Sequence, residues 1–172
     1  MADGENLGKH SSKDPSAVSP YEKFKRLPLD KRLEAFNVVL SFFETVASKE
    51  YVAIDFYDAS ILYDFPTDRI TICDIDLFAK QPYTNTMGRM WGSPRFMSPE
   101  EYTLGAIIDE VTNVYTLGAF AFFALGDEID RRFEKWQADR CLFDIATKAT
   151  DPDRTRRYQR IGEFAESWRS AS

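Results

Sequence analysis

Cysteine is scarce in this chain. Its 172 residues include only two cysteines, Cys73 and Cys141, which lie far apart and form no CxxC motif. Small secreted domains that depend on disulfides carry closely patterned pairs, so this spacing favours a reducing compartment. We therefore expect two free, buried thiols and a cytoplasmic protein.

Long apolar runs are absent as well. The longest run, Val114–Leu125, spans about a dozen residues, whereas a membrane-spanning helix needs about 20. This run therefore predicts a helix buried in a protein core, and we expect no membrane partner. Met1 is followed by a polar, acidic stretch, so we also expect no signal peptide.

The chain has no excess of positive charge. It contains 22 Lys and Arg residues against 28 Asp and Glu residues, a net charge of −6. Because nucleic-acid-binding domains present a basic face to the phosphates, this chain is a poor candidate for binding nucleic acid. Its hydrophobic fraction of 44% is enough for one domain with a sizeable core.

Residues 1–20 are polar and contain Asp-Gly, Asp-Pro and Ser-Pro pairs, which are typical of turns. We expect a loop here and a single lobe over residues 21–172. A short helix should begin near Pro20. Asp30 is expected to cap a longer helix that reaches about Ser48, since its apolar residues recur every three or four positions.

Two β-prone runs, Ser60–Tyr63 and Arg69–Cys73, are separated by five residues that favour a turn, which predicts a hairpin. Residues 77–105 show no lasting periodicity and predict a long, ordered, functional loop. The remaining pattern predicts helices over 107–125, 127–136, 139–149 and 157–170. The sequence therefore predicts a mainly α fold with one small β-hairpin.

Two aspartates lie where this hairpin would bring them together. Asp55 ends a short β-prone stretch, and Asp74 follows the second hairpin strand. The ends of a hairpin are adjacent, so both carboxylates should face the same space. Such a pair suits phosphoryl transfer, in which one carboxylate orients or deprotonates a hydroxyl and the other holds Mg²⁺.

Five segments, in the same order and with similar spacings along residues 20–170, resemble motifs of protein kinases. Residues 53–62, Ala-Ile-Asp-Phe-Tyr-Asp-Ala-Ser-Ile-Leu, resemble the catalytic loop His-Arg-Asp-Leu-Lys-Pro-x-Asn-Ile-Leu. Residues 72–77 resemble the segment around Asp-Phe-Gly. Residues 92–100 resemble Gly-Thr-x-x-Tyr-Met-Ala-Pro-Glu, residues 113–118 resemble Asp-Val-Tyr-Ser-Leu-Gly, and residues 151–164 resemble the family's last conserved turn.

The resemblance implies the C-terminal lobe of a bacterial, eukaryotic-type serine/threonine kinase, with the hairpin beside the catalytic loop. Asp55 would be the catalytic base. Asp74 and Ser60 would bind Mg²⁺ and ATP, and Asp76 could be an additional metal ligand. The resemblance further implies a buried ion pair that fixes the activation segment, between Glu100 and Arg157, and a side chain that braces the catalytic loop, Asn113.

Several positions depart from the family pattern. Ala53 and Ile54 replace the His and Arg before the catalytic Asp, and Tyr57 replaces the Lys. Ser60 replaces the Asn, and Asp76 replaces the Gly of Asp-Phe-Gly. The first 50 residues contain neither a Gly-rich phosphate loop nor a Val-Ala-Ile-Lys strand. Residues 1–20 therefore resemble a hinge-derived segment, and we expect this chain to lack the ATP-clamping N-terminal lobe.

Two functions follow from the resemblance. In the first, relatives with both lobes transfer the γ-phosphate of ATP to Ser or Thr hydroxyls of a protein substrate, while this chain alone is inactive. In the second, the chain is a pseudokinase lobe that binds a protein partner. A small-molecule phosphotransferase is a weaker alternative, because such enzymes lack a segment like residues 92–100. The oligomeric state is left open.

Overall fold

The computed structural model describes residues 4–8 and 18–171. About 48% of these residues are helical and about 11% lie in small antiparallel strands, which confirms a mainly α fold. The helices are α1 Pro20–Lys25, α2 Leu29–Ser48, α3 Glu110–Leu125, α4 Arg140–Ala149 and α5 Ile161–Ala171. The strands are β1 Glu5–Asn6, β2 Tyr51–Val52, β3 Ile61–Asp64, β4 Arg69–Ile72, β5 Ala79–Lys80, β6 Tyr83–Thr84 and β7 Ile107–Ile108. Short 3₁₀ turns are η1 Asp58–Ser60, η2 Pro99–Tyr102, η3 Phe133–Lys135 and η4 Arg154–Arg156.

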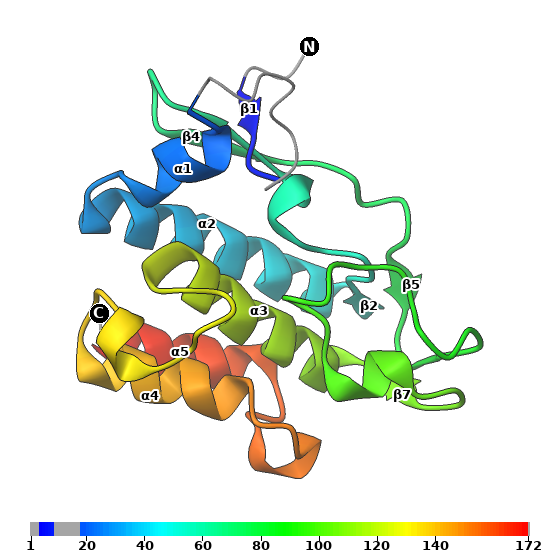
Figure 1. Cartoon of the computed structure of the whole chain (residues 1–172). Helices are drawn as coiled ribbons and strands as arrows, with labels where there is room; N and C mark the ends of the chain where they lie inside the picture. Colours follow the sequence, from blue (N-terminus) through cyan, green and yellow to red (C-terminus); the bar gives the residue numbers. More distant parts are fainter. Residues whose placement is uncertain (1–3, 9–17, 172) are drawn as a thin grey trace.

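The helices stack in layers, with α2 and α3 side by side across the middle (Figure 1). Helices α4 and α5 cover the far side of α3 (Figure 1). The sheet β1-β3-β4 and α1 lie on the opposite side of α2, and the two-stranded pairs β2-β5 and β6-β7 lie at one end of the helical layers. The loops that join these strands therefore gather at the edge of a helical scaffold.

Helix α3 is the centre of the core. Asp109 caps its N-terminus by accepting the Val111 backbone N–H at 3.0 Å, which satisfies a donor that has no partner inside the helix. Every residue of α3 except Glu110 and Tyr115 is buried, as expected of a helix that is apolar all round. Within residues 4–8 and 18–171, no helix is both long and apolar enough to cross a membrane.

Helix α2 packs one apolar face on α3, with Phe36, Val39, Leu40 and Phe43 fully buried. The expected N-cap is wrong by two residues. The helix begins at Leu29 after Pro28, and Asp30 lies inside its first turn. Proline fixes a backbone angle suited to a helix start, and the Asp30 carboxylate still interacts favourably with the positive end of the helix.

The predicted hairpin is confirmed. Strands β3 and β4 pair antiparallel, from Ile61 opposite Ile72 to Asp64 opposite Arg69. The expectation of a loop over residues 1–20 is wrong at Glu5–Asn6, which adds strand β1 to the free edge of β3. Backbone pairing and the full burial of Leu7 stabilise this short strand, which has no periodic signal of its own. Residues 1–3 and 9–17 lie outside the described part.

Two other local expectations are wrong. Residues 127–136 form no α-helix, because the Asp127 carboxylate accepts the backbone N–H groups of Ile129 and Asp130 at 2.8 and 2.9 Å and holds the chain in a turn. Only η3 is helical there. The long loop over 77–105 is ordered as expected, but it contains the strands β5 and β6 and the turn η2.

Both cysteines are free, as expected, but neither is buried. Cys73 is half-buried beside the hairpin, and Cys141 is exposed on α4. The expectation of two buried thiols is therefore wrong. On α4 the buried positions are Leu142, Ala146 and Ala149, and this helical spacing leaves Cys141 facing the solvent.

Gly118 sets how closely α3 and α4 approach. A Cβ atom at this position would lie 2.8 Å from the Ala149 Cβ and 3.0 Å from the Ala146 carbonyl oxygen. We expect Gly118→Ala to lower the free energy of unfolding by about 1–3 kcal/mol, because this overpacking outweighs the better helix propensity of alanine. Urea denaturation measures the change.

The matched control is Gly162→Ala on α5, where an added Cβ meets no atom within 4 Å. This variant should be neutral or more stable by up to about 1 kcal/mol. Equal effects of the two substitutions would contradict close α3–α4 packing.

Candidate functional site

Asp55 occupies the turn that follows β2. Its φ angle of 61° lies in the left-handed region, which non-glycine residues rarely adopt and which is enriched at functional sites. Burial raises the pKa of its carboxyl group, and the negative charge of Asp74 raises it further. The carboxylate is therefore held in an environment that makes it a better proton acceptor than a free aspartate.

Asp74 follows β4 and also has a left-handed backbone, with φ 58°. The hairpin extends to its neighbours, because the Cys73 N–H donates to the Ser60 carbonyl at 2.9 Å. Asp74 is exposed and lies close enough to Asp55 to repel its charge. The two carboxyl groups are thus close enough for their charges to interact, although Asp55 follows β2 and lies outside the β3–β4 hairpin.

Asn113 fixes the backbone in front of Asp55. Its Oδ1 accepts the Ala53 N–H at 2.7 Å, and its Nδ2 donates to the Ala53 carbonyl at 2.8 Å. The Asn113 side chain is fully buried, so these bonds satisfy polar groups that water cannot reach. The expected brace from α3 to residues 53–55 is confirmed.

A cleft of about 510 Å³ opens beside Asp55. Its walls are Asp55, Tyr57 and the segment Trp91–Arg95. Gly92, with φ 141°, lies so close that a Cβ there would be 3.9 Å from the Asp55 Oδ1 and only 2.9 Å from the Met97 Cγ. Glycine is therefore required where the backbone of residues 91–95 approaches Asp55.

Arg95 connects the segment Trp91–Arg95 to the rest of the site. The sequence analysis did not identify this residue. Its Nη2 donates to both carboxylate oxygens of the fully buried Asp58 at 2.8 Å. Its Nη1 reaches Glu128, whose carboxylate also accepts the Tyr21 hydroxyl. No spacing rule links residues 58, 95 and 128, so only the proximity of three loops reveals this network.

The other predicted metal ligands lie in different surroundings. Ser60 is fully buried, and its Oγ accepts the Tyr57 backbone N–H at 3.3 Å. Asp76 is exposed on the loop after β4. In the part of the chain that the structure describes, no group of three or more His, Cys, Asp or Glu side chains could hold a metal ion. Any cation here would need ligands from a bound molecule or from water.

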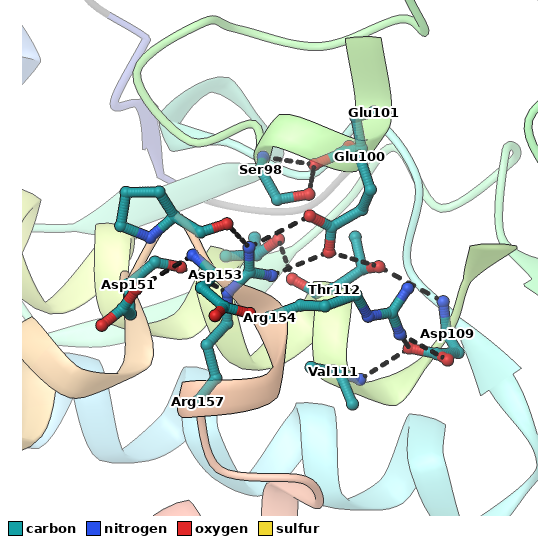
Figure 2. Close-up of polar contacts among 12 residues, drawn as sticks. Ser98, Glu100, Glu101, Asp109, Val111, Thr112, Asp151, Asp153, Arg154 and Arg157 are labelled. Atoms are coloured by element: carbon teal, nitrogen blue, oxygen red, sulfur yellow. Dashed lines mark hydrogen bonds and ion pairs between the residues drawn. The ribbon is translucent and has the colours of Figure 1, made fainter. Parts of the chain in front are cut away.

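A buried ion pair anchors the end of the 92–100 segment (Figure 2). Arg157 donates from Nη1 and Nη2 to the two oxygens of Glu100, at 2.7 and 3.0 Å. The Thr112 hydroxyl donates to Glu100 from α3 at 3.1 Å, and the Arg157 Nε donates to the Asp151 carbonyl at 2.7 Å. The predicted Glu100–Arg157 pair is thus confirmed, and it joins η2, α3 and the chain before α5.

The pKa values of the two neighbouring carboxyl groups of η2 are shifted in opposite directions. Burial raises the pKa of Glu100, but its hydrogen bonds to Arg157 and Thr112 and the charge of Arg157 lower it more, so the net shift is downward. Burial raises the pKa of Glu101 to about 7, although Ser98 donates its backbone N–H and its hydroxyl to that carboxyl (Figure 2). Only Glu100 has a buried guanidinium as its partner.

Comparison with known proteins adds no assignment, since no protein-family model and no curated protein matches the chain.

Removing one partner of the buried Glu100–Arg157 pair should lower the stability of the fold. We expect Arg157→Met to lower the free energy of unfolding by about 3–5 kcal/mol, because Glu100 would be left as an unpaired buried charge. Adding Glu100→Leu to this variant should restore part of the loss. Urea denaturation of the single and double variants measures the coupling.

Arg156 provides the matched control, because it lies next in the chain with an exposed side chain 3.4 Å from Asp151. Arg156→Met should cost less than about 1 kcal/mol. A similar loss in both single variants would show that the Arg157 pair contributes no more than a surface contact.

The raised pKa of Asp55 predicts that its charge destabilises the fold. An acid whose pKa is higher in the folded state costs stability above that pKa, and the cost is lost as the pH falls through it. We expect Asp55→Asn to raise the free energy of unfolding at pH 7 by well under about 1 kcal/mol, because solvent screens this partly exposed carboxyl, and the gain should disappear near pH 3. Urea denaturation of the wild type and of Asp55→Asn between pH 3 and pH 7 measures the difference.

Proposed function

We propose that the chain is the C-terminal lobe of a protein-kinase-like phosphotransferase that acts on Ser or Thr hydroxyls of a protein. The observation that carries this proposal is the Asp55–Asp74 pair: Asp55 lines an open cleft, and Asp74, which follows β4, lies close enough for its charge to act on the Asp55 carboxyl. Phosphoryl transfer depends on positioned carboxylates and a metal rather than on covalent chemistry. Five ordered sequence motifs support the same reading.

Asp55 would orient the acceptor hydroxyl and take its proton. A general base must be held in place and must be basic enough to accept a proton. Asn113 holds the backbone before Asp55, and burial together with Asp74 raises the pKa of the Asp55 carboxyl. The cleft beside it is open enough to admit a side chain that carries a hydroxyl.

Asp74 would be the principal ligand of a Mg²⁺ ion bound with ATP. Mg²⁺ in such sites is held by one or two carboxylates, and phosphate oxygens and water complete its coordination. The exposed Asp74 carboxylate could therefore bind Mg²⁺ without two further protein ligands beside it. The metal would neutralise the charge of the phosphate oxygens. Ser60 fits less well, since its hydroxyl already accepts the Tyr57 N–H, and the exposed Asp76 would be the alternative second ligand.

Tyr57 lines the cleft where kinases have a lysine. Burial, followed by the charges of Asp55, Asp74 and Asp58, raises the pKa of its hydroxyl above the ordinary value of 10.0. The phenol therefore stays protonated at neutral pH and would donate a hydrogen bond to a phosphate oxygen. It supplies no positive charge, so it would stabilise the transferring group less than a lysine does.

A catalytically inactive lobe that acts as a protein-interaction module is the second candidate. It is favoured by the engagement of the Ser60 hydroxyl within its own loop and by the replacement of the expected Lys by Tyr57. In this case Asp55 and Asp74 would be retained from an ancestral site and would bind no nucleotide.

Thermal unfolding with Mg²⁺ and ATP separates the two candidates. At a ligand concentration tenfold above Kd, binding should stabilise the chain by about 1.4 kcal/mol and raise Tm by about 3 °C. The shift should need both Mg²⁺ and ATP and should be lost in Asp74→Ala but kept in Asp55→Asn. A wild-type chain whose Tm does not respond would support the interaction module instead.

Phosphate transfer is not expected from the isolated chain, because its sequence carries no Gly-rich loop or lysine strand to position ATP. Incubation with radiolabelled ATP and a general protein substrate should therefore label nothing. Labelling that Asp55→Ala abolishes would show that this lobe is sufficient for catalysis.

A further inference from the structure

Two adjacent carboxylates in the turn η2 share a single buried cation. Glu100 and Glu101 are 8% and 5% exposed. The Arg157 guanidinium donates from Nη1 and Nη2 to the two oxygens of Glu100, and its Nε donates to the Asp151 carbonyl (Figure 2). None of these bonds reaches Glu101. The arrangement therefore compensates one buried negative charge and leaves the second to neutral donors.

Ser98 donates both of the hydrogen bonds that the Glu101 carboxyl group accepts from the described residues. Its backbone N–H and its hydroxyl donate to Oε2 at 2.6 and 3.0 Å (Figure 2). Both donors are neutral, and Ser98 is itself fully buried. Because a buried carboxylate without a cation is costly, such a group binds a proton instead. Burial, to which the charge of Glu100 adds, raises the pKa of Glu101 to about 7 although the Ser98 hydrogen bonds lower it.

The other charged groups around η2 do not neutralise Glu101. They come from η2 itself, from α3 and from the chain on either side, and are Arg89, Tyr102, Asp109, Tyr115 and Arg154. Arg154 donates from Nη2 to both oxygens of Asp109 at 2.7 Å, so these two charges are paired with each other (Figure 2). The charge of Arg157 lowers the pKa of Glu101, but this cation is already paired with Glu100. Among the described residues, Glu101 forms no ion pair of its own.

The Glu101 backbone also attaches a segment that leads to the candidate site. Its carbonyl accepts the Met90 N–H at 2.9 Å and a hydrogen bond from the Asn85 Nδ2 at 3.2 Å. We call residues 85–91 the Asn85 arm. The arm ends at Trp91, which lines the cleft of the candidate site. A change at Glu101 therefore reaches the cleft wall through two hydrogen bonds.

We propose that the protonation state of Glu101 controls how firmly the Asn85 arm is attached to η2, with the neutral acid favouring attachment and the carboxylate favouring release. The neutral acid needs no cation, and its remaining carbonyl oxygen can still accept from Ser98. The carboxylate needs water or a cation, and it reaches water when η2 and the arm separate. This response requires neither nucleotide nor phosphoryl transfer.

The direction of the pH response follows from linkage. The pKa of Glu101 is about 7 in the attached state, and it returns toward the ordinary value of 4.5 when the arm separates and water reaches the carboxyl group. An acid whose pKa is higher in one state favours that state as the pH falls through the raised value. Attachment of the Asn85 arm should therefore be firmer at about pH 6 than at about pH 8.

Hydrogen exchange of the Met90 amide at about pH 6 and pH 8 tests this, with each rate divided by the intrinsic rate at that pH. The protection factor of the wild type should be about tenfold higher at pH 6, because a pKa midway between the two pH values changes the attachment constant by that factor. Glu101→Gln keeps the shape of the side chain but cannot ionise, so its protection factor should be nearly the same at both pH values.

The matched control is Glu166→Gln, which removes an exposed glutamate of α5, outside η2 and the arm. This variant should keep the ratio of about tenfold, as should Asp74→Ala, which tests the nucleotide site. Equal protection of the Met90 amide at the two pH values in the wild type would overturn the proposal. A ratio that persists in Glu101→Gln would overturn it as well.

A carbon-13 NMR titration of the glutamate side chains of the wild type detects the proton directly and does not depend on how a variant folds. One carboxyl resonance should titrate with a midpoint near 7, about two pH units above an ordinary glutamate. A wild-type chain in which every glutamate titrates below about pH 5.5 would show that burial holds no proton on Glu101, and the proposed control of the Asn85 arm would be wrong.

Discussion

The nearly complete burial of α3 is the constraint on which the rest of the structure depends. An apolar helix that exposes only Glu110 and Tyr115 must be covered on all sides, so α2, α4 and α5 are packed around it. Gly118 lets α4 approach closely. The few polar side chains on α3 cannot reach water and must therefore find partners in the surrounding loops.

These contacts of the polar side chains on α3 position the candidate site. Asn113 holds the backbone before Asp55, and Thr112 shares Glu100 with Arg157. The functional side chains thus lie on loops, while a rigid helix fixes where the loops run, which is a common arrangement in enzymes and binding proteins. Such a site can keep its geometry after individual chemical groups are exchanged.

The carboxyl groups of the candidate site differ in how far their charge is compensated. The charge of Asp74 acts unfavourably on the Asp55 carboxylate, and both residues have left-handed backbones, whereas the buried Asp58 carboxylate accepts hydrogen bonds at both oxygens from Arg95. The Asp58–Arg95 pair is electrostatically compensated, whereas the Asp55 carboxyl keeps a raised pKa, and perturbed carboxyls of this kind are enriched at functional sites.

Much of this could be predicted from the sequence, because the signals are local or follow from the ends of a hairpin. Periodicity indicated α2, a continuous apolar run indicated α3, and two β-prone runs around a turn indicated the β3–β4 pair, after which Asp74 follows directly. The Glu100–Arg157 and Asn113–Ala53 contacts were implied by resemblance and are present in the structure. Only the tertiary structure decided that Glu5–Asn6 is a strand, that Asp127 ends a helical pattern, and that Arg95 joins Asp58 to Glu128. These features arise from pairing between distant segments, and such pairing leaves no period in the sequence because its energy comes from partners that are adjacent only in space.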